Sequence, residues 1–309
     1  ESVVHVRRRD STIFEKDQRC LSLDGDGDQR GGKMPKVLIT HEVPHEHLTP
    51  LHGVAEIVQG PPPYDMMDRA SVLDLAPELH GIINQTELRV DAELLDAAPQ
   101  LKIVANVAIG TDNLALDLMA ERGVWATNTP EAPVESTADF TLAMLLALVR
   151  RIPVLDRYVR TGDWETDGFQ PGRWDGVLLS GKTLGIIGYG RIGRGVARRA
   201  RAFGMNVVVF DPMATSEPDY RPLEELLPQS DVVSMHVPLV DSTLHLMNAE
   251  RFATMKPGAL FLNMARGKVV DESALVAALQ SGHVAGCLLY TSDAADEGLG
   301  VDLGGRRII

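Results

Sequence analysis

The sequence predicts an α/β protein built from two parallel-sheet units in tandem. Short apolar runs, among them KVLIT (36–40), HGIINQ (80–85) and KIVANVAIG (102–110), alternate with helical patterns such as DAELLDAAPQ (91–100). A second series of the same kind begins at Lys182. The 309 residues are enough for two domains of ordinary size, and 44% hydrophobic with 24% charged residues is a globular composition.

The first unit is expected over residues 34–132 and the second over residues 133–286. A long helix, predicted over residues 134–151, opens the second unit, and Pro133 stands at its start, where a missing amide hydrogen costs nothing. Residues 161–180 are rich in Gly, Asp and Trp without a clear period, which predicts a long loop. Strands are then predicted in TLGII (183–187), NVVVF (206–210), DVVSMHVP (231–238) and ALFLNMARG (259–267).

Neither end of the chain resembles the body between residues 34 and 286. Residues 1–33 lack any helical or strand period, and the GGK before Met34 matches a translated ribosome-binding site. We expect a non-native leader there, the alternative being a natural disordered extension. The pattern breaks after Gly286, and residues 287–309 resemble translated library and sequencing adaptors, which predicts an artefact. Cys20 and Cys287 both fall in these ends, so the body offers no cysteine for disulfide or thiolate sites.

Charge and hydropathy exclude several classes of partner. The net charge of −13 disfavours nucleic acid, because binding to phosphates depends on clustered Lys and Arg. No apolar run reaches the roughly 20 residues that a membrane span needs. The N-terminus carries no apolar signal segment, so a cytoplasmic protein is expected.

A glycine-rich motif, GYGRIG at 188–193, follows the strand TLGII and opens the next helix. Alone this pattern is a weak signal, but Asp211 ends the next strand about 20 residues on, as in dinucleotide-binding βαβ units. Gly188 permits the tight turn, Gly190 lets the backbone approach a diphosphate, and Gly193 lets helix and strand pack closely. A carboxylate at Asp211 accepts ribose hydroxyls and repels a 2′-phosphate, which predicts NAD rather than NADP. The alternative is a glycine-rich turn with an incidental aspartate.

Ligands of open parallel sheets bind beyond the carboxyl ends of the strands, where two side chains of the second unit are expected. Arg266 follows ALFLNMA and can grip a carboxylate or carbonyl oxygen with its planar guanidinium, unless it is an ordinary surface arginine. His236 ends a neighbouring strand and can donate a proton, although a structural or cofactor-lining role fits equally well. In the first unit, residues 107–110 can present backbone amides to a carboxylate or form a plain turn.

Several potential metal ligands lie close together near the start of the body. No second cluster supplies matching ligands, and exposed loops rich in histidine are common, so no metal is expected. The residues are His41, Glu42, His45, Glu46 and His47.

Several motifs together resemble the D-isomer-specific 2-hydroxyacid dehydrogenases, in the style of the glyoxylate and hydroxypyruvate reductases. The motifs are NVAIGTDN (106–113), ERGVWATNTPEAPVESTADFTLAMLLALVRR (121–151), GKTLGIIGYGRIG (181–193), HVPL (236–239) and NMARGKVVDESALVAAL (263–279). The resemblance covers residues 34–286. It implies a flavodoxin-like substrate domain followed by a Rossmann-type domain that binds NAD, with a homodimer as the assembly.

The resemblance also implies a reaction and its residues. A small 2-oxo acid would be reduced to the D-2-hydroxy acid at the expense of NAD(P)H. The backbone of Ala108, Ile109 and Gly110 would bind the substrate carboxylate, and Arg266 would polarise the carbonyl. The residues implied to contact the cofactor are Thr137, Gly188, Gly190, Arg191, Ile192, Gly193, Asp211, His236, Val237, Pro238, Thr243, Asn263 and Ala265.

The chain departs from the family pattern near its C-terminus. The family's catalytic glutamate falls at position 295, where Ala295 stands, an aspartate falls at Tyr290, and the catalytic histidine falls beyond Ile309. We therefore expect the C-terminal part of the dehydrogenase to be missing and the chain as written to have negligible turnover. The alternative function is a dinucleotide-sensing regulatory protein on the same scaffold; Arg266 favours the enzyme.

Overall fold

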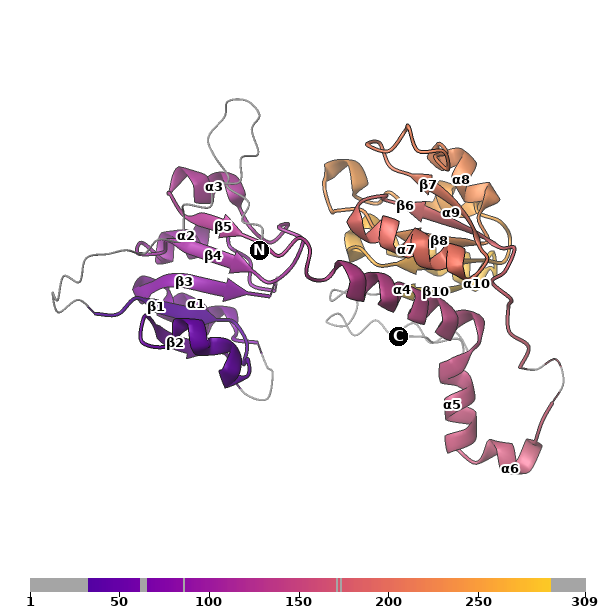
Figure 1. The fold of residues 1–309 in the computed structure, drawn as a ribbon, viewed down its shortest axis with the longest axis horizontal. Helices are drawn as coiled ribbons and strands as arrows, with labels where there is room; N and C mark the ends of the chain where they lie inside the picture. Colours follow the sequence, from indigo (N-terminus) through magenta and orange to yellow (C-terminus); the bar gives the residue numbers. More distant parts are fainter. Residues whose placement is uncertain (1–32, 62–65, 86, 171, 173, 290–309) are drawn as a thin grey trace. The chain divides into compact units, whose positions relative to one another are not determined.

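The chain divides into two compact units, the first ending at Glu131 and the second beginning at Ala132. The computed structural model describes residues 33–61, 66–85, 87–170, 172 and 174–289. Each unit is organised around its own five-stranded parallel sheet, and helices connect most of the successive strands (Figure 1). The predicted α/β class with two parallel sheets is therefore confirmed.

The first unit has the strand order β2-β1-β3-β4-β5, which is the order of flavodoxin-like sheets. Its strands are β1 (Lys36–Ile39), β2 (Glu56–Gln59), β3 (Leu79–Asn84), β4 (Ile103–Asn106) and β5 (Trp125–Thr127). Its helical elements are η2 (His45–Leu51), α1 (Arg69–Leu75), η3 (Ala76–Glu78), α2 (Ala92–Ala97) and α3 (Leu116–Glu121). The flavodoxin-like topology agrees with the family resemblance.

One face of this sheet carries the hydrophobic core of the first unit. Leu38 of β1, Ile82 of β3 and Val104 of β4 are register partners and are buried. Val72 of α1 and Leu94 of α2 belong to the same cluster. Because side chains alternate along a strand, this register also decides which polar residues stand together where the strands end.

The second unit has the strand order β10-β9-β8-β6-β7. Its strands are β6 (Thr183–Ile187), β7 (Asn206–Phe210), β8 (Val232–Met235), β9 (Ala259–Asn263) and β10 (Val284–Leu289). The order reverses between β6 and β8, since the chain passes from β6 outward to β7 and then crosses to β8. Ligands of open α/β sheets bind at such a switch point, beyond the carboxyl ends of the strands.

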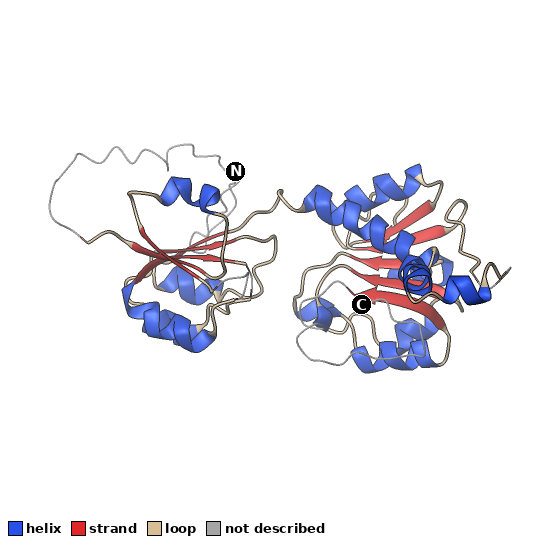
Figure 2. Cartoon of the chain, turned by 90° about the horizontal axis from the view of Figure 1, so that it is seen from below, coloured by secondary structure: helices blue, strands red, loops and turns tan. Residues whose placement is uncertain are grey.

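Helices cover both faces of the second sheet (Figure 2). On one face, α7 (Arg191–Ala202) packs on β6 and β7, and α4 (Val134–Val149) packs against α7 and β10. The opposite face carries α8 (Leu223–Gln229), α9 (Ala249–Thr254) and α10 (Glu272–Gln280). The α4–α7 contact is close, because a Cβ added to Gly195 would lie 3.1 Å from the Cβ of Ala138. Two short turns, η4 (Asp241–Thr243) and η5 (Gly267–Val269), complete the unit.

Several helices begin where the sequence supplies a side-chain cap. Asp68 caps α1, Asp91 caps α2, Asn248 caps α9 and Asp271 caps α10, each accepting a hydrogen bond from a first-turn amide. Such caps satisfy amides that have no partner within the helix. They account for sharp helix starts in both units.

Two corrections to the expected elements concern the chain after α4. The helix ends at Val149, two residues before its predicted end, because Arg151 adopts a left-handed conformation with φ 55°. The segment predicted as a loop over 161–180 contains a short helix, α6 (Asp163–Asp167), which follows α5 (Ile152–Arg160). Together α5 and α6 extend away from the second sheet (Figure 1).

The last described strand runs past the expected break in the sequence. β10 continues through Cys287 to Leu289 and pairs with β9, and Leu288 is fully buried. Cys-Leu-Leu suits a buried strand, so the strand pattern ends three residues after Gly286. The predicted leader up to residue 32 and the predicted artefact from residue 290, including Tyr290 and Ala295, lie outside the described residues. Within the described part, no helix combines the length and apolar character needed to cross a membrane.

Candidate dinucleotide and carboxylate sites

The glycine motif forms the turn between β6 and α7. Gly188 has φ +95°, and a Cβ there would lie 2.6 Å from the carbonyl oxygen of His236. A Cβ on Gly193 would lie 2.1 Å from the carbonyl oxygen of Gly188. Both contacts are with backbone, so neither position accepts a side chain without a shift of the turn. Gly190 is exposed, and no described atom lies within 4 Å of the place its Cβ would take.

The N-terminus of α7 presents backbone amides to the open side of this turn. Gly190 is the N-cap residue, and the amide of Arg194 is the first to bond back, to the carbonyl of Gly190 at 3.0 Å. The earlier amides of a helix have no acceptor within it, and the helix dipole adds positive potential. This arrangement over the space beside Gly190 can bind an anion such as a diphosphate.

Asp211 follows β7 and holds the turn through its carboxylate. One oxygen accepts the amide of Tyr189 at 2.8 Å, and the other accepts the amide of Met213 at 2.8 Å. A carboxylate has about four acceptor positions, so acceptor capacity remains for other donors. The orientation of the carboxylate is set by two backbone groups.

Arg194 lies over the Tyr189 ring, 4.6 Å from its centroid, and pairs with Glu217 at 2.6 Å.

His236 directly follows β8 at the switch point, where its amide donates to the carbonyl of Ile187 at 2.7 Å. Its Nε2 lies 2.9 Å from the hydroxyl of Ser234, and its Nδ1 is buried without a hydrogen-bond partner among the described residues. Burial lowers the pKa of His236 to about 3. The imidazole is therefore neutral near pH 7, which disfavours the proton-donor interpretation and favours a structural or cofactor-lining one.

Arg266 leaves the same edge of the sheet after β9. Asn263 shapes this exit, because its side chain donates to the carbonyl of Arg266 at 2.8 Å and accepts the amide of Ala265 at 3.0 Å. Arg266 is partly buried and also donates to the carbonyl of Ala265. Since all five strands are parallel, Arg266 and the glycine turn share the carboxyl edge.

The other predicted cofactor residues lie around that edge or on α4. After β8, Val237 and Pro238 continue from His236, and the hydroxyl of Thr243 donates to the carbonyl of Pro238 at 2.6 Å. Thr137 is in the first turn of α4, next to the Ala138 that packs against α7. Arg191 and Ile192 open α7.

In the first unit, the loop after β4 has its carbonyl groups turned toward the protein. The carbonyl oxygens of Ala108, Ile109 and Gly110 accept the Thr129 amide, the Asn128 side chain and the Asn106 side chain, each at 2.9 Å. A planar trans peptide places each carbonyl opposite the next residue's amide. The amides of residues 109–111 therefore face the other way, and they donate to no acceptor among the described residues. Such a row of amides can bind a carboxylate.

The metal hypothesis at the start of the body gains no support from the geometry. His45 and His52 place their ring centroids 4.6 Å apart. Within the described residues, no group of three or more His, Cys, Asp or Glu side chains is placed to hold an ion.

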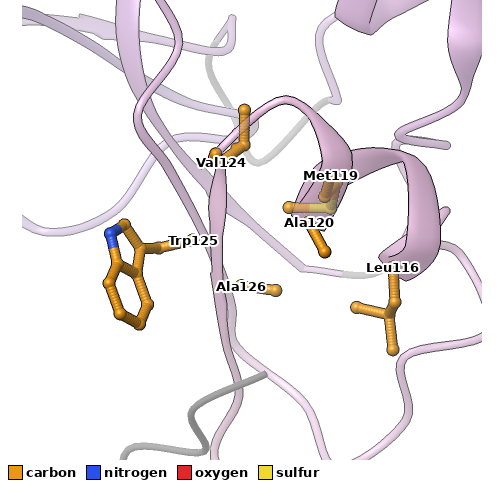
Figure 3. Close-up of a pocket in the computed structure, with 7 residues that line it drawn as sticks. Leu116, Met119, Ala120, Val124, Trp125 and Ala126 are labelled. Carbon is orange, nitrogen blue, oxygen red and sulfur yellow. The ribbon is translucent and has the colours of Figure 1, made fainter. Parts of the chain in front are cut away.

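A cavity of about 160 Å³ lies elsewhere in the first unit, between α3 and β5 (Figure 3). Figure 3 shows Leu116 and Met119 on the helix, with Trp125 pointing away on the far side of the strand. The lining is formed by apolar side chains and Gly123, and the cavity sits where β5 begins, not at the carboxyl edge. None of its lining residues has a charged side chain that could bind a 2-oxo acid or a dinucleotide phosphate.

Comparison with known proteins assigns the chain to a family. A family model for the NAD-binding domain of D-isomer-specific 2-hydroxyacid dehydrogenases matches residues 142–294. A glyoxylate reductase from Thermococcus onnurineus is 40% identical over 260 residues, covering 82% of this chain and 78% of that protein. The chain belongs to the D-isomer-specific 2-hydroxyacid dehydrogenase family. It is therefore related to NAD-binding oxidoreductases.

Solved structures of other dehydrogenases agree with the fold. A D-lactate dehydrogenase from Aquifex aeolicus, complexed with NAD and lactic acid, superposes with a TM-score of 0.72 at 32% identity, covering 83% of this chain and 76% of that one. An NADPH-dependent glyoxylate/hydroxypyruvate reductase from Sinorhizobium meliloti, with NADP and malonate, also gives 0.72 at 32% identity, covering 84% and 80%. Relatives of this dehydrogenase thus occur with either dinucleotide.

Sequence reasoning missed three residues that shape these sites in the dehydrogenase. Asn106 and Asn128 hold the loop after β4, and Ser234 contacts the imidazole of His236. The available signal was a polar residue at or just beyond the end of an apolar strand. That signal does not show which residue the polar side chain contacts until the strand register is known.

Two glycine substitutions separate cofactor binding from folding. We expect Gly190→Ala to keep the thermal stability of the protein and to weaken NADH binding at least about tenfold, because the methyl group enters only the space where a diphosphate would lie. Gly193→Ala meets the Gly188 carbonyl and should lower the free energy of unfolding by about 1–3 kcal/mol. Calorimetric melting and NADH titration measure both. Full NADH affinity in the Gly190→Ala protein would contradict this assignment.

His236 should make stability depend on pH. Because its pKa of about 3 in the folded protein lies below the ordinary 6.5, the unfolded chain binds one more proton between these values. Stability is full above about pH 6.5 and falls toward pH 3, by at most about 1.4 kcal/mol per pH unit. Urea unfolding between about pH 7 and about pH 5 should show a shallower slope for His236→Gln than for wild type. Parallel slopes would refute the buried neutral imidazole.

Proposed function

We propose that this chain carries the cofactor and substrate sites of an NADH-dependent reductase of small 2-oxo acids of the glyoxylate and hydroxypyruvate type, which forms D-2-hydroxy acids. The observation that carries the proposal is the shared carboxyl edge of the second sheet, where the glycine turn follows β6, Asp211 follows β7 and Arg266 is reached after β9. The 40% identity to a glyoxylate reductase supports the substrate class. The NAD-binding family model supports the cofactor class.

The second unit suits a dinucleotide at three points. The amides at the start of α7 bind the diphosphate over Gly190, whose missing side chain leaves the needed space. The Asp211 carboxylate, which the amides of Tyr189 and Met213 hold in place, accepts hydrogen bonds from the ribose hydroxyls. A phosphate on the 2′-hydroxyl would bring two negative groups together, which favours NADH over NADPH.

The chemistry assigned to the chain's residues is the binding and polarisation of the 2-oxo acid. Bound NADH supplies the hydride that reduces C2. The amides of residues 109–111 bind the substrate carboxylate, and the Arg266 guanidinium draws electron density toward the carbonyl oxygen. His236 stays neutral and lines the cofactor site; the proton for the new hydroxyl comes from another group.

We extend the proposal to a homodimer in the cytoplasm, where NADH is available. The α5–α6 arm, defined as residues 152–170 and 174–178, is held internally by Tyr158, whose ring centroid lies 4.6 Å from that of Trp174. Its outer surface exposes large apolar side chains, a feature typical of interfaces. These are Ile152, Val159, Trp164, Phe169, Val177 and Leu178. A second copy of the chain is the partner that the family resemblance implies.

The cofactor preference is tested at Asp211. Wild type should bind NADH at least about tenfold more tightly than NADPH, and Asp211→Ser should narrow this ratio by weakening NADH and relieving repulsion of NADPH. Nicotinamide fluorescence titration gives both constants. Asp219→Ser is the matched control, because Asp219 pairs with Arg201 on the surface. Equal wild-type affinity for the two cofactors would refute the assigned role.

The substrate role is tested at Arg266 with oxamate, a carboxylate that resembles a 2-oxo acid. Arg266→Lys keeps the charge but loses the planar fork, so oxamate binding to the NADH complex should weaken at least about tenfold while NADH binding is unchanged. Arg122→Lys is the control, because Arg122 precedes β5 in the first unit and pairs with Asp96. Titration calorimetry measures both ligands, and unchanged oxamate affinity in the Arg266→Lys protein would remove this residue from the proposal.

The role of the α5–α6 arm in the dimer is tested by placing charged side chains on it. Phe169 and Leu178 are both 71% exposed, and replacing both with Asp should convert a dimer to a monomer in sedimentation velocity, because two charges cannot be buried cheaply at an apolar interface. Val54→Asp, at an exposed apolar residue of the first unit, should leave the dimer intact. A monomeric wild type, or a dimer that survives the double substitution, would contradict this role of the arm.

A further inference from the structure

A row of asparagines crosses the carboxyl end of the first sheet. Asn84 ends β3 and is the register partner of Asn106, which ends β4. Asn128 directly follows β5, whose last residue Thr127 pairs with Ala105. Residues two apart on a strand share a face, so the row continues the face that carries the hydrophobic core. Asn84 and Asn106 are almost completely buried.

The side chains of this row reach the loops beyond the strands. Asn106 donates to the Gly110 carbonyl and exchanges hydrogen bonds with Asn113, at 2.9 and 3.2 Å. Asn113 in turn donates to the carbonyl of Leu88 at 3.1 Å, on the neighbouring loop. Asn128 donates to the Ile109 carbonyl at 2.9 Å. Side-chain amides of Asn106 and Asn128 therefore hold the loop after β4 through its carbonyl groups.

The chemistry of asparagine suits this task. Each bond needs a donor aimed at a carbonyl oxygen, and an ionised aspartate of the same shape has only acceptors. In Asn128 the Oδ1 atom is buried and has no hydrogen-bond partner among the described residues, whereas its Nδ2 donates to the Ile109 carbonyl. A buried acceptor without a hydrogen-bond partner lowers the free energy of unfolding. The donor of the same side chain must therefore contribute something that offsets this cost.

We infer that Asn106 and Asn128 are positioning residues for the substrate carboxylate. They hold the carbonyls of Gly110 and Ile109 inward, which turns the amides of Thr111 and Gly110 outward to converge on one anion. Neither asparagine touches the substrate. This inference rests on the proposed function, since it assumes that the loop receives the carboxylate of a 2-oxo acid.

The test measures oxamate binding to the full chain saturated with NADH, by calorimetry and by amide shifts in NMR. Asn128→Ala should weaken oxamate binding about tenfold, on the scale of one lost hydrogen bond, and leave NADH affinity unchanged. Asn128→Asp should weaken it further, because its carboxylate repels the Ile109 carbonyl. Asn106→Ala should act in the same direction. Asn206→Ala removes a similar bond, to the Gly181 carbonyl, and should have no effect.

Hydrogen exchange separates positioning from loss of fold. In Asn128→Ala, protection of β1, β3 and β4 should match wild type, while the loop amides exchange faster; this variant decides the question if Asn106→Ala fails to fold. Wild type that binds NADH but shows no oxamate-dependent shift of amides 109–111 would overturn the proposed substrate site. Shifted amides in wild type, with equal oxamate affinity in a folded Asn128→Ala, would overturn the positioning role alone.

Discussion

The second unit depends on one close contact, between the β6–α7 turn and the neighbouring backbone. Only glycine permits this contact. With Gly193 lying against the Gly188 carbonyl and Gly188 against the His236 carbonyl, α7 begins directly over the ends of β6 and β8. The same closeness brings Tyr189 within reach of Asp211, which couples the turn to β7. The start of α7, the ends of β6 and β8, and Asp211 are thus held together by one set of backbone contacts.

The anion sites that we propose in the two units depend on different structural features. In the second unit the helix itself leaves its first amides without internal acceptors, and glycine clears the space above them. In the first unit no helix begins at the loop after β4, so the amides must be turned outward by fixing the carbonyls inward. Side-chain donors from Asn106 and Asn128 do this, together with the amide of Thr129. Both sites follow from backbone polarity rather than from charged side chains.

Much of the fold could be predicted from the sequence, because the longer strands and α4 carry strong periodicity. β2 and β5 are short, and β10 runs into Cys-Leu-Leu; none of the three has a period long enough to fix its limits. Phe140 belongs to the apolar pattern of α4 but is 37% exposed, since helical periodicity does not say which flank of a stripe is covered. The nucleotide turn was predictable because its residues are contiguous. The asparagine row was not, since its members lie 22 residues apart and meet only through strand register.

The most direct test follows the backbone amides of residues 190–193 by NMR while NADH is added to the purified protein up to about millimolar concentration, the weak end of specific binding. We expect saturable shifts at these amides and at the Asp211 amide, with a single dissociation constant. Amides that stay in place at that concentration, or shifts confined to other segments, would contradict the claim that the diphosphate lies over the start of α7.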